Sequence, residues 1–168
     1  MATLAPPAQR TFLLQRVQPA LSGLIDGALS SLAPIFAVAL ATRDPHYAFV
    51  AGLATAVGAS ISMAFSEGLS DTGELTERGS PWARGAIVGG GTFVGGILHT
   101  LPFLLPSFAA AMAAALLVVL VELVALAWIR HRFFDLPFRS SLASVAVGGL
   151  LIAALSASIG AVLGQSTP

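Results

Sequence analysis

Three residues that could bind a cation lie in segments otherwise apolar enough to cross a membrane: Asp26, Met63 and Glu67. A carboxylate at membrane depth costs roughly 2.5–3.5 kcal/mol on insertion scales, so it persists mainly where it faces a bundle interior or an ion path. Met63 and Glu67 are four residues apart, which places them on one face of a helix. Two simpler interpretations remain: Asp26 could cap a neighbouring helix, and Met63 could pack against lipid or core.

Polar residues accompany Asp26 along the same helical face. Ser22 and Ser30 lie one turn before and one turn after it, and Pro34 follows on the same row. Proline cannot donate a hydrogen bond to the carbonyl of Ser30, so a kink is expected there with an oxygen left for a cation or water.

Four further carboxylates are weaker candidate ligands: Glu122, Asp71, Glu74 and Glu77. Glu122 is the only polar residue in the run 116–128, in what we expect to be the cytoplasmic half of its helix, the same layer as Asp26, Met63 and Glu67. It could instead pair structurally with Arg130 or Arg132. The other three lie in the connector after Glu67, where they could gather cations at a funnel mouth or form an ordinary solvated loop.

The residue types indicate which cation would bind. A carboxylate in a low-dielectric bundle can hold a proton or a metal ion near neutral pH, but not both, and this exclusion is the basis of metal–proton exchange. Oxygen ligands alone suit Mg²⁺, Ca²⁺ or Mn²⁺, whereas a thioether shifts the preference toward Fe²⁺ and other first-row divalent ions.

Composition identifies the elements that must position these residues. The chain of 168 residues is 56% hydrophobic and 10% charged, with a mean hydropathy of +0.88, which is typical of a membrane protein. Segments near the length needed to cross the hydrocarbon must be helical, because lipid cannot satisfy backbone polar groups. The expected spans are 21–41, 48–68, 85–105, 108–129 and 141–163, forming one all-α domain over 21–168 after a cytoplasmic lead-in over 1–20.

The charge distribution predicts an orientation. Seven of the eight arginines fall on one side of the expected spans and only Arg43 falls on the other. The positive-inside rule then places the N-terminus in the cytoplasm and the C-terminus outside, in a multi-pass protein of the cell (inner) membrane. A cleaved signal peptide over residues 1–42 is a further interpretation, but the apolar run is long for one and contains Asp26 and Pro34.

Small residues predict close helix contacts. The third expected span has GxxxG spacings at Gly85–Gly89 and Gly91–Gly95, and the second carries the stripe Ala54, Gly58, Ser62 and Ser66. Such faces let helix backbones approach closely, within one chain or between two copies. His99 follows the glycine-rich stretch, where a neutral histidine bonded to a backbone carbonyl is favoured over a metal ligand or a proton relay.

Three motifs resemble the vacuolar iron transporter family: SGLIDGALSS, GLATAVGASISMAFSEGLS and the glycine-rich third span closing on HTLPFLLP. The resemblance covers about residues 20–164. The stretch SEGLSDTGELTERGSPWARG looks closest to the bacterial subgroup of membrane-bound ferritin (erythrin-type) proteins, in which this domain follows a ferritin-like domain.

The resemblance implies a five-span homodimer with its N-terminus inside, which exports Fe²⁺ or Mn²⁺ from the cytosol in exchange for protons. The path would run along the dimer interface, with Asp26, Met63 and Glu67 matching the family's metal-path residues. Thr55 stands where plant members often carry an acid, and the acidic cytosolic insert is reduced to the short connector. The sequence holds no ferritin-like domain, and three alternatives stay open: a stand-alone transporter, a piece of a longer chain that carries such a domain, or a transporter served by a separate ferritin-like partner.

Two other classes of function compete with metal transport. A proton-coupled exporter of organic cations would need an aromatic-lined pocket around Asp26 or Glu122, and a non-transporting oligomerisation domain would have no use for the acids. No catalytic constellation, tightly bound cofactor or nucleic-acid partner is expected. The metal ion would be cargo.

Overall fold

The computed structural model describes residues 7–74, 76 and 78–165, which are helical throughout apart from short connectors, with no strand among them. The elements are α1 (Pro7–Phe12), a π-helical turn η1 (Leu13–Val17), α2 (Gln18–Ser30), α3 (Leu32–Thr42), α4 (Pro45–Gly68), α5 (Pro81–Leu98), a 3₁₀ turn η2 (Leu101–Leu104), α6 (Phe108–Phe134) and α7 (Phe138–Gln165). The all-α class expected from the sequence is confirmed.

Four helical stretches are long and apolar enough to cross a membrane: Ala8–Thr42, Pro45–Gly68, Phe108–Phe134 and Phe138–Gly160. The third expected span, 85–105, differs from the prediction because its helix ends at Leu98 and a separate 3₁₀ turn follows. The 18 residues of α5 include Arg84 and six glycines. They cover about 27 Å at 1.5 Å per residue, near the lower limit for a span.

The first membrane-length helix begins well before the expected residue 21. The lead-in is helical from Pro7 onward and runs through η1 directly into α2. The helix is interrupted at Ser31, three residues before Pro34, and resumes as α3. The interruption therefore falls five residues after Asp26, a little more than one helical turn.

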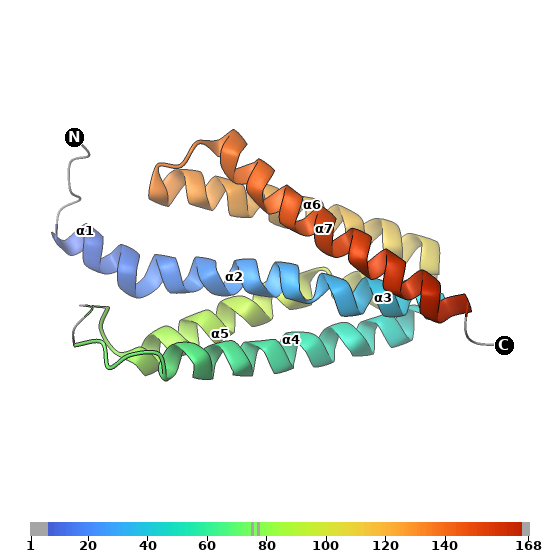
Figure 1. The fold of residues 1–168 in the computed structure, drawn as a ribbon, viewed down its shortest axis with the longest axis horizontal. Helices are drawn as coiled ribbons and strands as arrows, with labels where there is room; N and C mark the ends of the chain where they lie inside the picture. Colours follow the sequence, from blue (N-terminus) through green and yellow to red (C-terminus); the bar gives the residue numbers. More distant parts are fainter. Residues whose placement is uncertain (1–6, 75, 77, 166–168) are drawn as a thin grey trace.

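The elements form an elongated bundle of roughly parallel and antiparallel rods (Figure 1). The start of α1, the α4–α5 connector and the α6–α7 connector lie at one end of the bundle, and the α3–α4 and α5–α6 connectors lie at the other. The seven arginines grouped by the sequence belong to segments at or near the first end, and Arg43 belongs to the second. The bundle thus has one arginine-rich end.

Local signals explain where α4 and α5 begin. The side chain of Asp44 accepts a hydrogen bond from the backbone N–H of His46 at 2.8 Å, and Pro45 occupies the first turn. Ser80 caps α5 in the same way, with Pro81 following it. Side-chain caps satisfy otherwise unpaired N–H groups, and proline tolerates the first turn because its missing donor is not needed there.

Glycines hold α5 tightly between α2 and α4, as the GxxxG spacings predicted. A Cβ added to Gly85 or Gly89 would meet carbonyl oxygens of α4 at 2.5 and 2.7 Å, and one added to Gly91 or Gly95 would meet carbonyl oxygens of α2 at 2.7 and 2.5 Å. These distances are too short for any side chain. The two motifs therefore face two different helices of the same chain.

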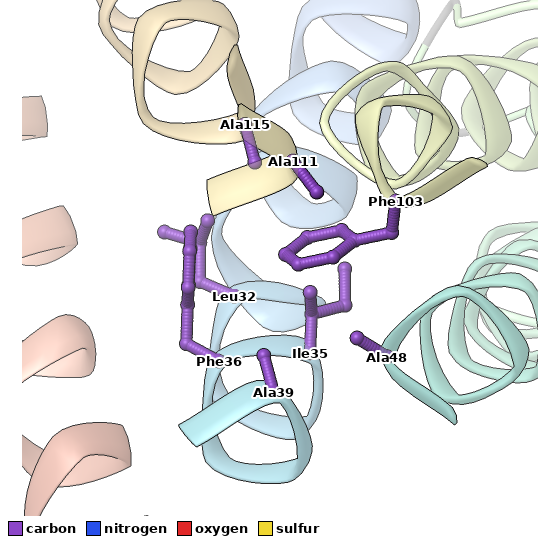
Figure 2. Close-up of a cluster of buried hydrophobic side chains, with 8 residues drawn as sticks. All are labelled: Leu32, Ile35, Phe36, Ala39, Ala48, Phe103, Ala111 and Ala115. Atoms are coloured by element: carbon purple, nitrogen blue, oxygen red, sulfur yellow. The ribbon is translucent and has the colours of Figure 1, made fainter. Parts of the chain in front are cut away.

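The main apolar core lies around α3, where it meets α4, η2 and α6 (Figure 2). Phe36 and Phe103 pack edge to face with ring centroids 6.4 Å apart. Alanines at Ala39, Ala48 and Ala111 are fully buried and let the helices approach. This core stabilises the half of the bundle away from the arginine-rich end and leaves the polar residues to the other half.

Candidate metal site

Asp26 and Met63 line one open pocket with a volume of about 490 Å³. The pocket lies between α2, α4 and α7, and its lining consists of Ser22, Ile25, Asp26, Leu29, Ser30, Met63 and Ile152. The four-residue row on α2 turns Ser22, Asp26 and Ser30 to the same side. The pocket thus brings together a carboxylate, two hydroxyls and a thioether, which are the ligand types expected for a first-row divalent ion.

Asp26 is half-buried and makes no hydrogen bond or ion pair with any residue that the structure describes. It is not a cap for a neighbouring helix, so that simpler interpretation is wrong. The helix break at Ser31 lies one turn further along, and Pro34 cannot donate to the carbonyl of Ser30. A carboxylate with free lone pairs beside a broken helix can accept a proton or a cation.

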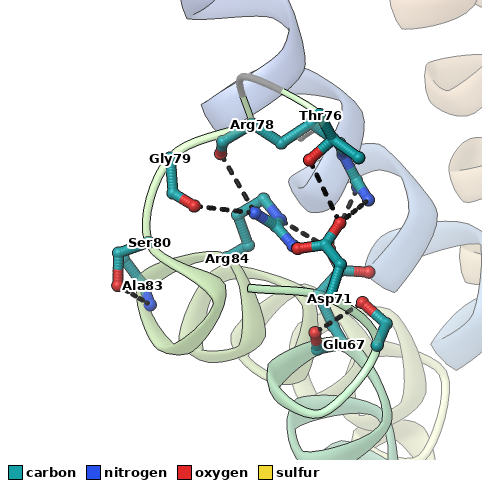
Figure 3. A network of polar contacts seen from close by, with 9 residues as sticks. Glu67, Asp71, Thr76, Arg78, Gly79, Ser80, Ala83 and Arg84 are labelled. Carbon is teal, nitrogen blue, oxygen red and sulfur yellow. Dashed lines mark hydrogen bonds and ion pairs between the residues drawn. The ribbon is translucent and has the colours of Figure 1, made fainter. Parts of the chain in front are cut away.

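Glu67 does not line this pocket; arginines hold it at the arginine-rich end of the bundle (Figure 3). Its Oε1 accepts a hydrogen bond from Arg84 Nε at 2.6 Å and lies 3.0 Å from Arg78 Nη2. Arg84 Nη2 also donates to Asp71 Oδ1 at 2.7 Å. The two acids therefore share two arginines in one ion-pair network.

Arg84 is the centre of that network and is 1% exposed. Its remaining amino group, Nη1, donates to the backbone carbonyls of Arg78 and Gly79 at 3.2 and 2.9 Å. The hydrogen bond from Arg84 holds the pKa of the Asp71 carboxyl below its usual range. With every nitrogen of its guanidinium engaged, Arg84 ties the connector to the ends of α4 and α5.

The other two connector acids have different positions. Glu74 is exposed, as an ordinary solvated loop residue would be, and Glu77 lies outside the described residues. Since Asp71 is paired with arginine, the funnel of acids suggested by the sequence is reduced to Glu74 among the described residues of the connector.

Thr55 on α4 donates to the carbonyl of Ala51 at 2.7 Å in its own helix.

Glu122 is buried and pairs with His99, not with Arg130 or Arg132. Its Oε2 lies 2.8 Å from Nδ1 of His99, and Nε2 of His99 lies 2.9 Å from the hydroxyl of Ser31. The structural pairing with arginine considered from the sequence is therefore wrong. So is the alternative in which His99 bonds a backbone carbonyl.

These contacts also show that Glu122 and Glu67 lie at different depths along the bundle. Glu67 bonds Arg84 in the first turn of α5, whereas Glu122 bonds His99 just beyond the last turn of that helix. At 1.5 Å per residue the two ends are about 22 Å apart along the axis. The expectation that these acids share one membrane layer is wrong.

No group of three or more His, Asp or Glu side chains that could hold a metal occurs among the described residues. Asp26 with Met63 is consequently a sparse site, suited to passing an ion rather than retaining one. We do not include Glu122 among the metal ligands, since its Oε2 is occupied by His99 and the other side chains around it are apolar.

Comparisons with protein-family models, with curated proteins and with solved structures find no match to this chain.

Proposed function

We propose that this chain exports a divalent metal ion, Fe²⁺ or Mn²⁺, from the cytosol in exchange for protons. The observation that carries the proposal is the shared pocket of Asp26 and Met63, with an acid that has no partner among the described residues. Metal and proton would compete for the Asp26 carboxylate, which couples their movements. The Met63 sulfur would favour Fe²⁺ over harder ions.

The pocket linings favour a metal over an organic cation. Neither the pocket around Asp26 nor the cavity around Glu122 has an aromatic residue in its lining. An aromatic face is the usual recognition surface for an organic cation. Serine hydroxyls and a thioether offer little surface to such a cation but are suitable ligands for a metal ion.

In the proposed arrangement α5 is a fifth span, the arginine-rich end faces the cytoplasm and two copies form a homodimer. Support for the dimer comes from α4, where Ala54, Gly58, Ser62 and Ser66 are all exposed and a Cβ on Gly58 would meet nothing within 4 Å. The pocket of Asp26 is also open in a single chain. A second copy on the small-residue face of α4 would shield that pocket from lipid.

The decisive experiment is a flux assay on the purified protein in liposomes that contain a metal indicator and a pH dye. With an imposed pH gradient, added Fe²⁺ or Mn²⁺ should move across the membrane and protons should move the opposite way. Empty liposomes are the control. A metal flux that is the same with and without the pH gradient, or no metal flux at all, would reject the exchange mechanism.

The dimer can be tested at Gly58. Leucine there adds bulk to the exposed small-residue face at a position where an added Cβ meets nothing within 4 Å, so Gly58→Leu should weaken dimers and transport together. Leu117→Ala, on an exposed part of α6, is the matched control. A monomeric Gly58→Leu protein with full transport would contradict a path at the dimer interface.

The orientation can be tested with a cysteine at Ala8, since the natural chain contains none. A membrane-impermeant thiol reagent should label Ala8→Cys only after the cells are opened. Labelling in intact cells would reverse the proposed topology.

A further inference from the structure

A chain of hydrogen bonds crosses the middle of the bundle and is separate from the pocket of Asp26. It runs from the carbonyl of Gly27 through Ser31 and His99 to Glu122, linking the break between α2 and α3 to the end of α5 and to α6. Ser31 and His99 are at most 1% exposed and Glu122 is 8% exposed. Buried polar groups in such a position need a function or a strong structural reason.

The hydrogen bond to Gly27 determines where the protons of this chain lie. Ser31 Oγ donates to the carbonyl of Gly27 at 2.6 Å, so its single proton is used and it can only accept from His99. Nε2 of His99 must therefore carry a hydrogen. The contact between Nδ1 of His99 and Oε2 of Glu122, at 2.8 Å, then requires one more proton, held by either atom.

The other carboxylate oxygen of Glu122 is unsatisfied. Oε1 is buried and has no hydrogen-bond partner among the described residues. Glu122 lines a cavity of about 190 Å³ between α2, α5 and α6, whose other lining side chains are apolar. This volume is large enough to hold water molecules beside the Glu122 side chain.

A second cavity, of about 300 Å³, extends from the first toward the arginine-rich end. Leu24 and Ile129 line both cavities, and the second also touches Arg16 and Phe133. The shared lining residues place the two cavities next to each other between the arginine-rich end and Glu122. Both lie on a different side of α2 from the pocket that contains Asp26.

We infer that Ser31, His99 and Glu122 form a proton-binding site in which Oε1 of Glu122 is the atom that accepts and releases the exchangeable proton. When the proton of the Nδ1–Oε2 contact is held on Nδ1, Glu122 is a carboxylate. A proton arriving on water then adds to Oε1 to give the neutral carboxylic acid, and it leaves by the same oxygen. No metal ion takes part. The site thus binds protons whether or not the chain transports a metal.

Other charged groups near this site are few. His99 on α5 is the only ionisable side chain in contact with Glu122 among the described residues. On α2, Asp26 faces a different pocket. The nearest charge on α6 itself is Arg130, and α7 carries only Arg139, at its first turn. Proton binding should therefore depend mainly on the His99–Glu122 pair.

The hydrogen-bond arrangement can be tested on the metal-free wild-type protein labelled with ¹⁵N at histidine. Nε2 of His99 should carry a hydrogen at neutral pH, because the hydroxyl of Ser31 can only accept there. His99→Gln assigns the signal, and exposed His131 provides the internal reference. An Nε2 of His99 without hydrogen would overturn the inference.

Proton uptake at Oε1 can be followed by the infrared C=O stretch of a protonated carboxyl group during a metal-free pH titration. In an Asp26→Asn background, which removes the other proton-binding carboxylate of the spans, a pH-dependent band should be present, should be lost when Glu122→Gln is added and should be retained with the surface control Glu74→Gln. If Glu122→Gln does not fold, Glu122→Asp should keep the band at a shifted frequency. An unchanged titration in either Glu122 variant would refute the site, and metal flux plays no part in this result.

Discussion

Asp26 and Glu67 are both membrane-segment carboxylates, yet their surroundings in the folded chain are opposite. Asp26 faces an open pocket and has no polar partner among the described residues, whereas Glu67 is held by Arg84 at 2.6 Å and Arg78 at 3.0 Å. A free carboxylate can bind a proton or a metal. A carboxylate whose charge is already compensated mainly stabilises the connector between two helices, and a metal would have to displace an arginine to reach it.

The largest expected effect is that of Asp26→Asn. The change keeps size and hydrogen-bonding capacity but removes the charge that both metal and proton require, so metal-dependent proton flux should fall to background. Because Asp26 has no polar partner among the described residues, stability should change by no more than about 0.5 kcal/mol. The liposome assay and thermal unfolding measure the two quantities. Wild-type Fe²⁺ flux in a well-folded Asp26→Asn protein would refute the proposed mechanism.

Arg84→Leu should produce the opposite pattern, with a large loss of stability. It removes the shared partner of Glu67 and Asp71 from a buried position, and breaking such a network typically costs about 3 kcal/mol. Denaturant unfolding in detergent would measure the loss. Arg139→Leu, at an exposed arginine on α7, is the control and should be nearly neutral. Equal stability of the two variants would mean that the network does not hold the connector.

Met63→Leu should have an intermediate effect that depends on the metal. Leucine keeps volume and apolarity but lacks the sulfur, so Fe²⁺ flux should fall by about fivefold, or about 1 kcal/mol, and Mn²⁺ flux by less. Parallel flux measurements with the two ions give the ratio. An equal loss for both ions would indicate that Met63 only packs.

Glu67→Gln tests whether Glu67 and Asp26 have different roles in metal transport. If metal entering from the cytoplasm first displaces an arginine from Glu67, the variant should raise the metal concentration needed for half-maximal flux and leave maximal flux close to wild type. A collapse like that of Asp26→Asn would place both acids in one binding site.

The smallest effect concerns acid pH. Because Arg84 lowers the pKa of Asp71 in the folded protein, this carboxylate contributes stability above its unfolded value of about 3.9. The contribution is lost as pH falls from that value through the lower folded pKa. The ring of Trp82 packs beside Gly68 and Phe65, so its fluorescence should report the loss of this stability at acid pH. Trp128→Phe removes the other tryptophan, so that the signal comes from Trp82 alone. The same transition in Asp71→Asn would exclude Asp71 as its origin.

Periodic patterns in the sequence predicted the local features well. The GxxxG spacings, the helix interruption before Pro34 and the common orientation of Asp26 with its serines all depend on residues within two turns of one another. The predicted approach of Met63 to Asp26 relied on family resemblance rather than on spacing, and the shared pocket agrees with it.

Contacts between distant segments could not be predicted in the same way. His99 and Glu122 are separated by a 3₁₀ turn and the first half of α6, and Ser31 and His99 by three whole helices, so no periodicity relates them. The pairing of Arg84 with Glu67 had a weak signal, since opposite charges occur at adjoining ends of two consecutive helices. The end of α5 at Leu98 was missed because apolar composition continues past it to Leu105.

The interruption at Ser31 lies between two groups of packed helices. Before it, α2 is locked to α5, and α5 to α4, by backbone contacts at glycine. After it, α3 packs on α7, and α7 packs on α6. A hinge rotation at Ser31 would move the second group of helices against the first and would disturb the contacts that join them, such as the close approach of Gly52 on α4 to Ile35 on α3. The hydroxyl that ends the hydrogen-bond chain from Glu122 sits on that hinge, so bending would stretch or shorten the chain first.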